Sequence, residues 1–243
     1  MMHKVLMVAF AGSLFAQGAA VNAQSIDWSG AYIGLTAGHG RNSSQFDDTS
    51  YNGGIPGFPP YSFDVDTKGA QWGIFGGYNW QRDTQVYGVE LEIGRSEAEG
   101  SAFPPFNDPF GDPYDAAGGV EAGWYGTLAG RLGVVRDKSL FYGKLGLAYS
   151  DARATFVDTC TAAPCGPGVI DASGALGWGL LAGIGIDHAL SEKWVLRAEY
   201  EYIHFGSADA SGDNISPGMP NVPTVIGGDM SSQRLKLGIS FKF

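Results

Sequence analysis

Apolar and polar residues alternate with a period of two along several stretches of the chain, most clearly in the last one. In the final segment, SSQRLKLGISFKF, every second residue from Leu235 to Phe243 is apolar, and the residues between are polar or glycine. A period of two with one apolar face is typical of a β-strand, whereas an amphipathic helix needs spacings of three and four. A chain terminus this apolar is expected to be fixed in an apolar environment.

The same alternation predicts eight strands in all. Two clear examples are WGIFGGYNW at residues 72–80 and KWVLRAEYEY at residues 193–202. The predicted strands span residues 29–41, 68–80, 85–98, 121–135, 139–154, 174–188, 193–206 and 229–243.

The connections between these strands are of two kinds that alternate strictly. Tight polar connections lie at residues 81–84, 136–138 and 189–192, and long ones rich in Gly, Pro, Asn and Asp lie at residues 42–67, 99–120, 155–173 and 207–228. Outer-membrane barrels have an even number of strands, short periplasmic turns and long extracellular loops. The sequence therefore predicts an all-β protein: an eight-stranded antiparallel transmembrane β-barrel with four long extracellular loops and three short periplasmic turns.

The first 23 residues predict export. A basic start that includes Lys4 is followed by an apolar run from Val5 to Ala16 and by small residues up to Ala23. This is the pattern of a cleaved secretory signal peptide, and the apolar run is too short to span a bilayer. We expect a signal peptide at residues 1–23 and one barrel domain at residues 24–243.

The composition agrees with a barrel and argues against a nucleic-acid partner. The chain has 38 glycines and 13% aromatic residues, but only 16% charged residues. Without Lys4, 14 basic residues stand against 25 acidic ones, a formal charge of −11. Binding to nucleic acid needs a basic face, so no such partner is expected.

Six tryptophans lie near the ends of the predicted strands. They form two groups, one next to the start of the barrel or the short connections and one near the long connections: Trp28, Trp80 and Trp194, and Trp72, Trp124 and Trp178. Aromatic residues gather at both interfaces of a membrane barrel. The six tryptophans are therefore predicted to form two aromatic belts.

If the apolar faces contact lipid, the opposite faces place charges inside the barrel. The predicted interior set has four acidic and five basic residues: Glu90, Glu92, Glu199, Glu201, Arg131, Lys144, Arg197, Arg234 and Lys236. Eight strands enclose an interior just wide enough for side chains, and unpaired charges in it are costly. We expect a mutually paired network. Two interpretations stay open: a polar plug that sets strand register, or a narrow, gated channel for ions or small solutes.

The only two cysteines, Cys160 and Cys165, lie in the motif CTAAPC within the third long connection. An exported protein with two cysteines most often pairs them, so a disulfide is predicted. A metal site would need more ligands, and this connection contains no histidine. No metal and no cofactor are expected.

Three stretches of the chain resemble a known family. DWSGAYIGLTAGHG at residues 27–40 resembles the first strand of the small porin-family surface proteins of alphaproteobacteria, which include the major surface antigens of Brucella and the haemin-binding proteins of Bartonella. AEYEYIHFGS at residues 198–207 resembles the seventh strand, although His204 stands where an acidic residue is usual. RLKLGISFKF resembles the closing strand with its terminal phenylalanine.

The resemblance implies a location in the outer membrane of a Gram-negative cell, with membrane lipid and lipopolysaccharide as partners. It also implies that the outer-membrane assembly machinery reads the closing strand by strand addition, through Leu235, Leu237, Ile239, Phe241 and Phe243. The expected function is structural: a surface-exposed barrel that contributes to envelope integrity and to loop-mediated interactions. Binding of haemin or a host-surface ligand by the extracellular loops is a further alternative.

Some barrels of this size are lipid acyl hydrolases, and they use a lipid-facing histidine and serine two residues apart. Here His204 is followed by Ser207 three residues later, so the two fall on opposite faces of a strand. His39 and His188 have no serine two residues away. We therefore predict that the protein is not an enzyme.

Overall fold

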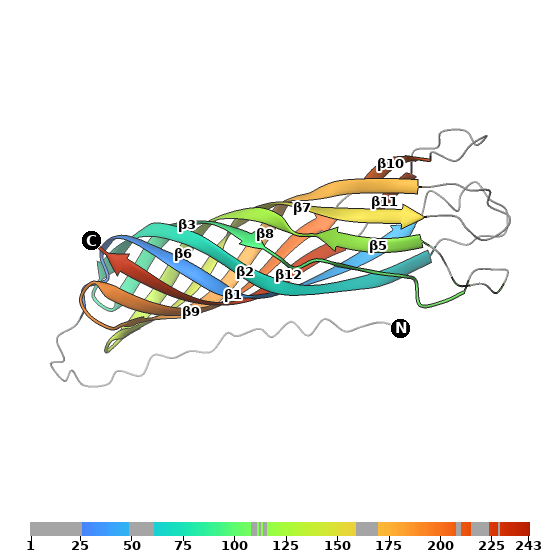
Figure 1. Cartoon of the computed structure of the whole chain (residues 1–243). Coiled ribbons are helices and arrows are strands. Elements are labelled where there is room, and N and C mark those ends of the chain that lie inside the picture. The colour runs from blue at the N-terminus through green and yellow to red at the C-terminus, as the bar shows by residue number, and fades with distance from the viewer. Residues whose placement is uncertain are drawn as a thin grey trace.

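The fold is a closed antiparallel β-barrel. The computed structural model describes residues 26–48, 61–107, 111, 113, 116–158, 170–207, 210–214, 224–227 and 229–243. Its eight long strands are β1 (Gly30–Asp48), β2 (Tyr61–Arg82), β3 (Gln85–Ser96), β6 (Gly123–Arg136), β7 (Ser139–Asp158), β8 (Ile170–Ala189), β9 (Trp194–Ser207) and β12 (Asp229–Lys242). Successive long strands pair with one another, and β12 pairs with β1 to close the barrel (Figure 1). The predicted fold class is confirmed.

The three short connections are tight turns. Those between β2 and β3 and between β6 and β7 have two residues each, and they begin with Asp83 (φ 55°) and Asp137 (φ 52°). Aspartate tolerates this left-handed backbone conformation better than most residues with a side chain. The third turn is closed by a hydrogen bond from Leu190 N to Trp194 O at 2.8 Å. This end of the barrel therefore has the short turns that are typical of the periplasmic end of an outer-membrane barrel.

Along the central part of each strand, large apolar side chains point outward and polar or small ones point inward. On β3, Leu91 and Ile93 are exposed on the outer surface, whereas Glu90 and Glu92 are buried in the lumen. Contact with lipid accounts for an apolar outer face of this kind. In the described part of the chain, we find no helix of the length and apolarity needed to span a membrane.

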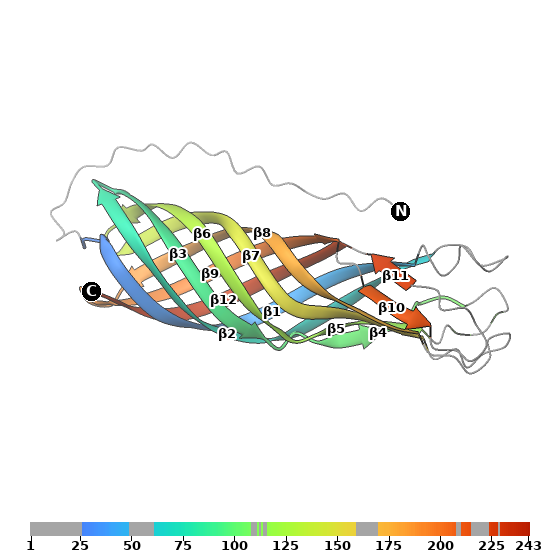
Figure 2. The ribbon, with the colours of Figure 1, turned by 90° about the horizontal axis from the view of Figure 1, so that it is seen from above.

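The predicted long connections are too wide, because strands reach into all four of them. The long strands β1, β2, β7 and β8 extend into residues 42–67 and 155–173. Four short strands lie in the other two connections: β4 (Gly100–Ala102), β5 (Ala116–Glu121), β10 (Ala210–Asn214) and β11 (Thr224–Gly227). Since β5 pairs with β7, β10 with β8, and β11 with both β10 and β1, the barrel wall continues beyond the central part (Figure 2).

The alternation of side chains is inverted in this extension. On β2, Phe63 and Val65 are buried in the lumen, whereas Asp64 and Asp66 are exposed on the outside. Beyond the lipid the barrel wall faces water, so the polar face must turn outward and the apolar face inward. The sequence predicts a connection here instead, because residues 42–67 are rich in Gly, Pro, Asn and Asp.

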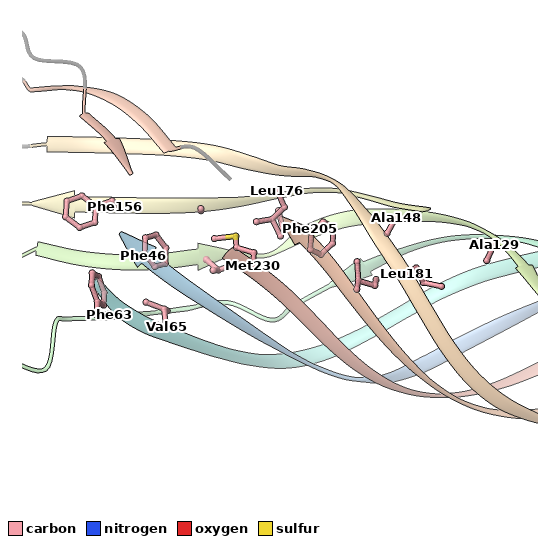
Figure 3. Close-up of a cluster of buried hydrophobic side chains, with 14 residues drawn as sticks. Phe46, Phe63, Val65, Ala129, Ala148, Phe156, Leu176, Leu181, Phe205 and Met230 are labelled. Atoms are coloured by element: carbon pink, nitrogen blue, oxygen red, sulfur yellow. The ribbon is translucent and has the colours of Figure 1, made fainter. Parts of the chain in front are cut away.

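The inward apolar residues of the extension fill the outer part of the lumen. Figure 3 shows Phe46, Phe63 and Phe156 gathered there, with Met230 and Phe205 deeper in the barrel. The rings of Phe46 and Phe63 are stacked, with centroids 5.6 Å apart. This outer apolar cluster closes the lumen on the side of the long connections with packed side chains.

Five of the six tryptophans lie on the outer surface. They are Trp72, Trp124 and Trp178 toward the long connections, and Trp80 and Trp194 toward the short turns. The ring centroids of Trp72 and Trp124 are 5.6 Å apart, and those of Trp80 and Tyr87 are 5.7 Å apart. Both groups have the placement that aromatic belts at the two membrane interfaces would need.

Trp28 does not belong to either group, which corrects the predicted belt. Its side chain is only 2% exposed and packs inside the lumen near the short turns. Trp28 precedes β1, so the alternation that places outward and inward residues in a strand does not apply to it.

Gly146 on β7 offers a test of the close packing between strands. A Cβ at this position would overlap the carbonyl oxygen of Leu128 and the backbone of Ala129 on β6. We expect Gly146→Ala to lower the free energy of unfolding of the refolded barrel by about 1–3 kcal/mol, because the backbone must shift. Gly130→Ala is the control, since a Cβ there would meet no atom within 4 Å. Equal urea midpoints for the two variants would contradict this expectation.

Candidate functional site

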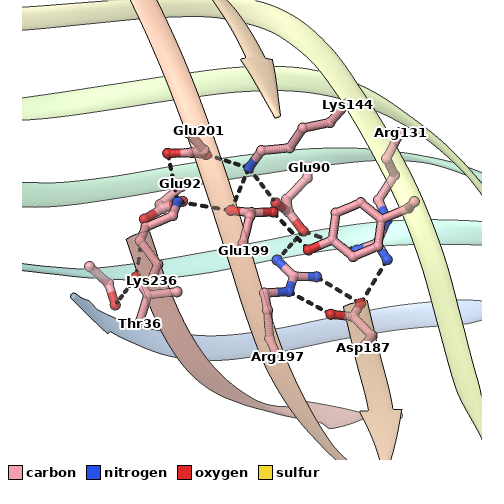
Figure 4. Close-up of polar contacts among 12 residues, drawn as sticks. Thr36, Glu90, Glu92, Arg131, Lys144, Asp187, Arg197, Glu199, Glu201 and Lys236 are labelled. Carbon is pink, nitrogen blue, oxygen red and sulfur yellow. Dashed lines mark hydrogen bonds and ion pairs between the residues drawn. The ribbon is translucent and has the colours of Figure 1, made fainter. Parts of the chain in front are cut away.

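Within the described ranges, ten charged side chains, five acidic and five basic, are buried in the middle of the lumen. They are Glu90, Glu92, Arg131, Lys144, Asp187, Arg197, Glu199, Glu201, Arg234 and Lys236. Nine of them are the residues that strand alternation places inside. The tenth, Asp187, is not among the residues predicted to lie inside, although it continues the inward face of β8 after Gly183 and Gly185. Ion pairs join nine of these ten residues, all except Arg234 (Figure 4). We call these nine residues the lumen network.

Two arginines and two carboxylates form one half of the lumen network. Asp187 accepts hydrogen bonds from Arg197 Nε at 2.8 Å and from Arg131 Nη2 at 2.7 Å. Glu90 Oε2 accepts from Arg197 Nη1 at 2.6 Å and from Arg131 Nη1 at 3.2 Å. Each guanidinium group therefore bridges the same two carboxylates, which come from β3 and β8.

Two lysines and three glutamates form the other half. Lys236 Nζ lies 2.5 Å from Glu92 Oε2, and its distances to Glu199 Oε1 and Glu201 Oε2 are 3.0 and 2.9 Å. Lys144 Nζ lies 2.5 Å from Glu201 Oε1 and 2.9 Å from Glu199 Oε1. Both ammonium groups thus share two glutamates of β9.

Lys144 connects the two halves, and three tyrosine hydroxyls form hydrogen bonds with carboxylates of the network. Lys144 Nζ lies 3.3 Å from Glu90 Oε1, which links the lysine half to the arginine half. Three tyrosine hydroxyls donate to the carboxylates: Tyr32 to Glu90 at 2.8 Å, Tyr142 to Glu199 at 2.7 Å and Tyr125 to Glu92 at 2.9 Å. These tyrosines share the inward face of their strands with charged residues or with glycine, but tyrosine is not charged and the alternation alone does not mark it as part of a network.

Three of the carboxylates have the spacing of a metal site. Oxygen atoms of Glu92, Glu199 and Glu201 lie within 4.8 Å of one another. Lys236 Nζ contacts all three, so its ammonium group occupies the position that a metal ion would need. The trio therefore serves as the counter-charge of lysine: all three glutamates pair with Lys236, and two of them also pair with Lys144.

Arg234 is buried but lies outside the paired network, which corrects its predicted membership. Its guanidinium group lies 3.9 Å from the ring centroid of Tyr125, and its Nε donates to Ser232 Oγ at 3.4 Å. None of the ion pairs in the described ranges includes Arg234. Glu201 lies directly across from it on β9, but the carboxylate of Glu201 is bound by two lysines.

The lumen network is suited to fixing strands rather than to chemistry. Every one of its five carboxylates forms at least one ion pair, and its residues come from β3, β6, β7, β8, β9 and β12. A buried charge that loses its partner is very costly, so each pair opposes sliding of one strand against another.

The other predicted site residues lie elsewhere. Leu235, Leu237 and Ile239 point outward from β12, and Phe243 is 74% exposed. The ring of Phe241 lies 5.4 Å from that of Trp194 and 5.5 Å from that of Phe243, measured between centroids. Cys160 and Cys165 lie outside the described residues, as do residues 1–23, so the disulfide and the signal peptide stay predictions.

One serine and one histidine meet on the outer surface near the short turns. Ser139 Oγ on β7 lies 2.9 Å from His188 Nδ1 on β8, a contact between strands that spacing along the sequence does not reveal. Ser–His catalysis also needs a group that orients the histidine. Among the described residues, no carboxylate forms a hydrogen bond with His188, so the pair lacks this group.

On the outside of the extension, Arg41 and Asp66 form a surface ion pair at 2.7 Å. The hydrogen bond from Arg41 lowers the pKa of Asp66 below its ordinary value. The resulting contribution to stability is present above the unfolded pKa, about 3.9, and is lost as the pH falls through the folded pKa. We expect carboxyl NMR to show Asp66 titrating below its ordinary value, and Arg41→Gln to raise that midpoint. An unchanged midpoint in the variant would contradict this cause.

Comparisons with known proteins agree with this architecture. A family model described as "Outer membrane protein beta-barrel domain" matches residues 6–243. The 25 kDa outer-membrane immunogenic protein of Brucella abortus is 28% identical over 226 residues, which cover 91% of this chain and 82% of the relative. The 31 kDa outer-membrane immunogenic protein of Brucella melitensis is 28% identical, covering 75% and 73%. The 22 kDa outer membrane protein of Rhizobium leguminosarum is 30% identical, covering 74% and 71%.

One solved structure shows the same kind of fold, and a second superimposes less well. The outer membrane protease OmpT of Escherichia coli superimposes with a TM-score of 0.51 at 6% sequence identity, covering 93% of this chain and 99% of that one. Neisserial surface protein A superimposes with a TM-score of 0.43 at 15% identity, covering 88% and 98%. Together with the family match, the curated relatives confirm the family resemblance and the outer-membrane location that the sequence predicts. The chain therefore belongs to the family of outer membrane protein beta-barrel domains.

Proposed function

We propose that the protein is a structural component of the outer membrane that contributes to envelope integrity and presents its long connections at the cell surface. The observation that carries this proposal is the filled lumen. Ion pairs occupy its middle, and the outer apolar cluster occupies the end near the long connections. A barrel filled in this way is stiff and suited to mechanical and barrier roles. The word "immunogenic" in the names of the Brucella relatives supports exposure at the surface.

A deletion strain tests this function. Cells that lack the protein are expected to become more sensitive to detergents and to release more periplasmic protein than wild-type cells. Complementation with the intact gene should reverse both effects, and complementation with a variant that is not inserted should not. Normal barrier function in the deletion strain would contradict a role in envelope integrity.

A narrow channel for ions or small solutes is the second candidate, and the polar middle of the lumen favours it. Charged and hydroxyl groups extend there from Asp187 to Glu92. The outer apolar cluster opposes conduction, since packed phenylalanines offer no polar path. We therefore expect planar bilayers with the refolded barrel to show no steady conductance. Large, stable conductance steps would contradict this and favour the channel.

Two interactions complete the proposal. Binding of haemin or a host-surface ligand would use the long connections, and residues 49–60, 159–169 and 215–223 of these lie outside the described residues. Spectral titration with haemin tests that alternative.

Assembly would use the closing strand β12, which pairs with both β1 and β9. The outward face of this strand is apolar from Leu235 to Phe243. Removal of Phe243 tests the recognition of β12 by the assembly machinery.

A further inference from the structure

Residues 26–29, before β1, are fastened across the barrel end that carries the short turns. Lys242 Nζ on β12 donates to the carbonyl oxygen of Asp27. Trp28 N donates to Gln81 Oε1 at 2.7 Å, and Gln81 N donates to Ser29 Oγ at 3.1 Å. The segment is therefore held by both strands that flank β1, namely β2 and β12.

The side chain of Trp28 points from this segment into the lumen. It packs in an apolar cluster with residues of β3, β7, β8 and β9: Val86, Leu140, Tyr142, Ala189 and Val195. Because Trp28 is buried among strands from the far side of the barrel, it covers the lumen at this end. It lies on the periplasmic side of the lumen network, opposite the outer apolar cluster.

The polar atom of this tryptophan is left without a protein partner. Within the described part of the chain, Trp28 Nε1 is a buried donor with no acceptor in reach, and Asn79 Oδ1 is a buried acceptor with no donor in reach. Buried polar atoms are almost always hydrogen-bonded, so each of these two atoms indicates a missing partner.

Both residues line the same small cavity, together with Tyr32, Asp187, Val195, Ser240 and Lys242. Its volume is about 10 Å³. A single water molecule needs a cavity of about 10–15 Å³ and two or more polar partners. The cavity has room for one water and for no larger ligand.

We propose that one ordered water molecule binds in this cavity and locks residues 26–29 over the periplasmic mouth of the barrel. The water accepts a hydrogen bond from Trp28 Nε1 and donates one to Asn79 Oδ1. Only a molecule that both donates and accepts satisfies this pair, which excludes a simple cation or anion. Through Asp187, which binds Arg131 and Arg197, the water lies at the edge of the lumen network. Residues 26–29 then act as a latch that keeps periplasmic solvent out of the network.

Water-to-protein NMR transfer in the refolded, deuterated barrel tests the water site. The indole proton of Trp28, assigned from its loss in Trp28→Phe, should show a cross peak with long-lived water. Trp80, which lies on the outer surface, is the internal control and should show none. Asn79→Leu removes the acceptor at similar volume and should abolish the cross peak, whereas Ser240→Ala keeps the donor and the acceptor and should retain it. Absence of the cross peak in the wild type, or its persistence in Asn79→Leu, would overturn the proposal.

Hydrogen exchange of Arg197 tests the latch. Arg197 Nε donates to Asp187 Oδ1 inside the network, so its proton should exchange slowly in the wild-type barrel. Trp28→Ala opens the periplasmic mouth and should accelerate this exchange, while heat-shift electrophoresis confirms that the variant is folded. Unchanged exchange in a folded Trp28→Ala barrel would show that residues 26–29 do not control access to the network. If that variant does not fold, Trp28→Phe provides the test, since loss of the bound water should still accelerate exchange.

Discussion

Replacing Lys236 with methionine is expected to lower the free energy of unfolding of the refolded barrel by about 3–5 kcal/mol, because three buried carboxylates lose a shared partner. Lys236 Nζ lies within 3.0 Å of Glu92, Glu199 and Glu201, and both the lysine and the glutamates are almost fully buried. Methionine fills a similar volume, so the loss of charge dominates the effect. Urea unfolding in detergent micelles, followed by tryptophan fluorescence, measures the change.

Arg234→Met is the matched control, since Arg234 lies two residues away on the same inward face of β12 and is equally buried. It contacts the ring of Tyr125 but no carboxylate of the network. Its replacement is therefore expected to cost less, about 1–2 kcal/mol, which is the scale of a desolvated cation–π contact. Equal losses for the two variants would mean that the ion pairs of Lys236 have no special weight in the stability of the barrel.

Deleting Phe243 is expected to reduce the amount of protein inserted in the outer membrane by about tenfold or more, if the assembly machinery reads this residue. Loss of one anchor residue from a binding pocket costs about 2 kcal/mol or more, and about 1.4 kcal/mol corresponds to a factor of ten. Surface labelling of intact cells measures the yield. The stability of the purified, refolded barrel should fall by only about 1–2 kcal/mol or less, since the side chain is largely exposed.

Leu145→Ala is the control for the loss of an outward apolar side chain. Leu145 on β7 is 72% exposed, close to the 74% of Phe243, but it is not part of the closing strand. It should reach the surface at the wild-type level. Equal surface yields for the Phe243 deletion and the wild type would leave Phe243 as an ordinary aromatic residue at the membrane interface.

Much of the barrel could be predicted from local patterns. The period of two on β3, β9 and β12 identifies both the strands and the two faces, and it places Glu90, Arg197 and Lys236 in the lumen. This works because the direction of a strand side chain depends only on its parity along the chain. The strict alternation of long and short connections then indicates strand number and orientation.

The outer extension shows where the pattern becomes ambiguous. Phe63 and Val65 alternate with Asp64 and Asp66 as regularly as residues in the lipid-facing strands, but their apolar side chains point inward. Alternation gives two faces without saying which one faces the lumen. That depends on whether lipid or water surrounds the wall, which is set by the height of a residue in the assembled barrel.

By itself, the sequence determined the eight lipid-facing strands, their two faces and nine of the ten buried charges described in the lumen, because each follows from residues that are neighbours along the chain. Only the tertiary structure decided the partners. Arg131 and Asp187 are 56 residues apart, and Glu90 and Arg197 are 107 residues apart, yet they form ion pairs across the lumen. The same closure buries Trp28 and leaves Arg234 on the ring of Tyr125. The register of eight strands sets which side chains meet, and no local pattern contains that register.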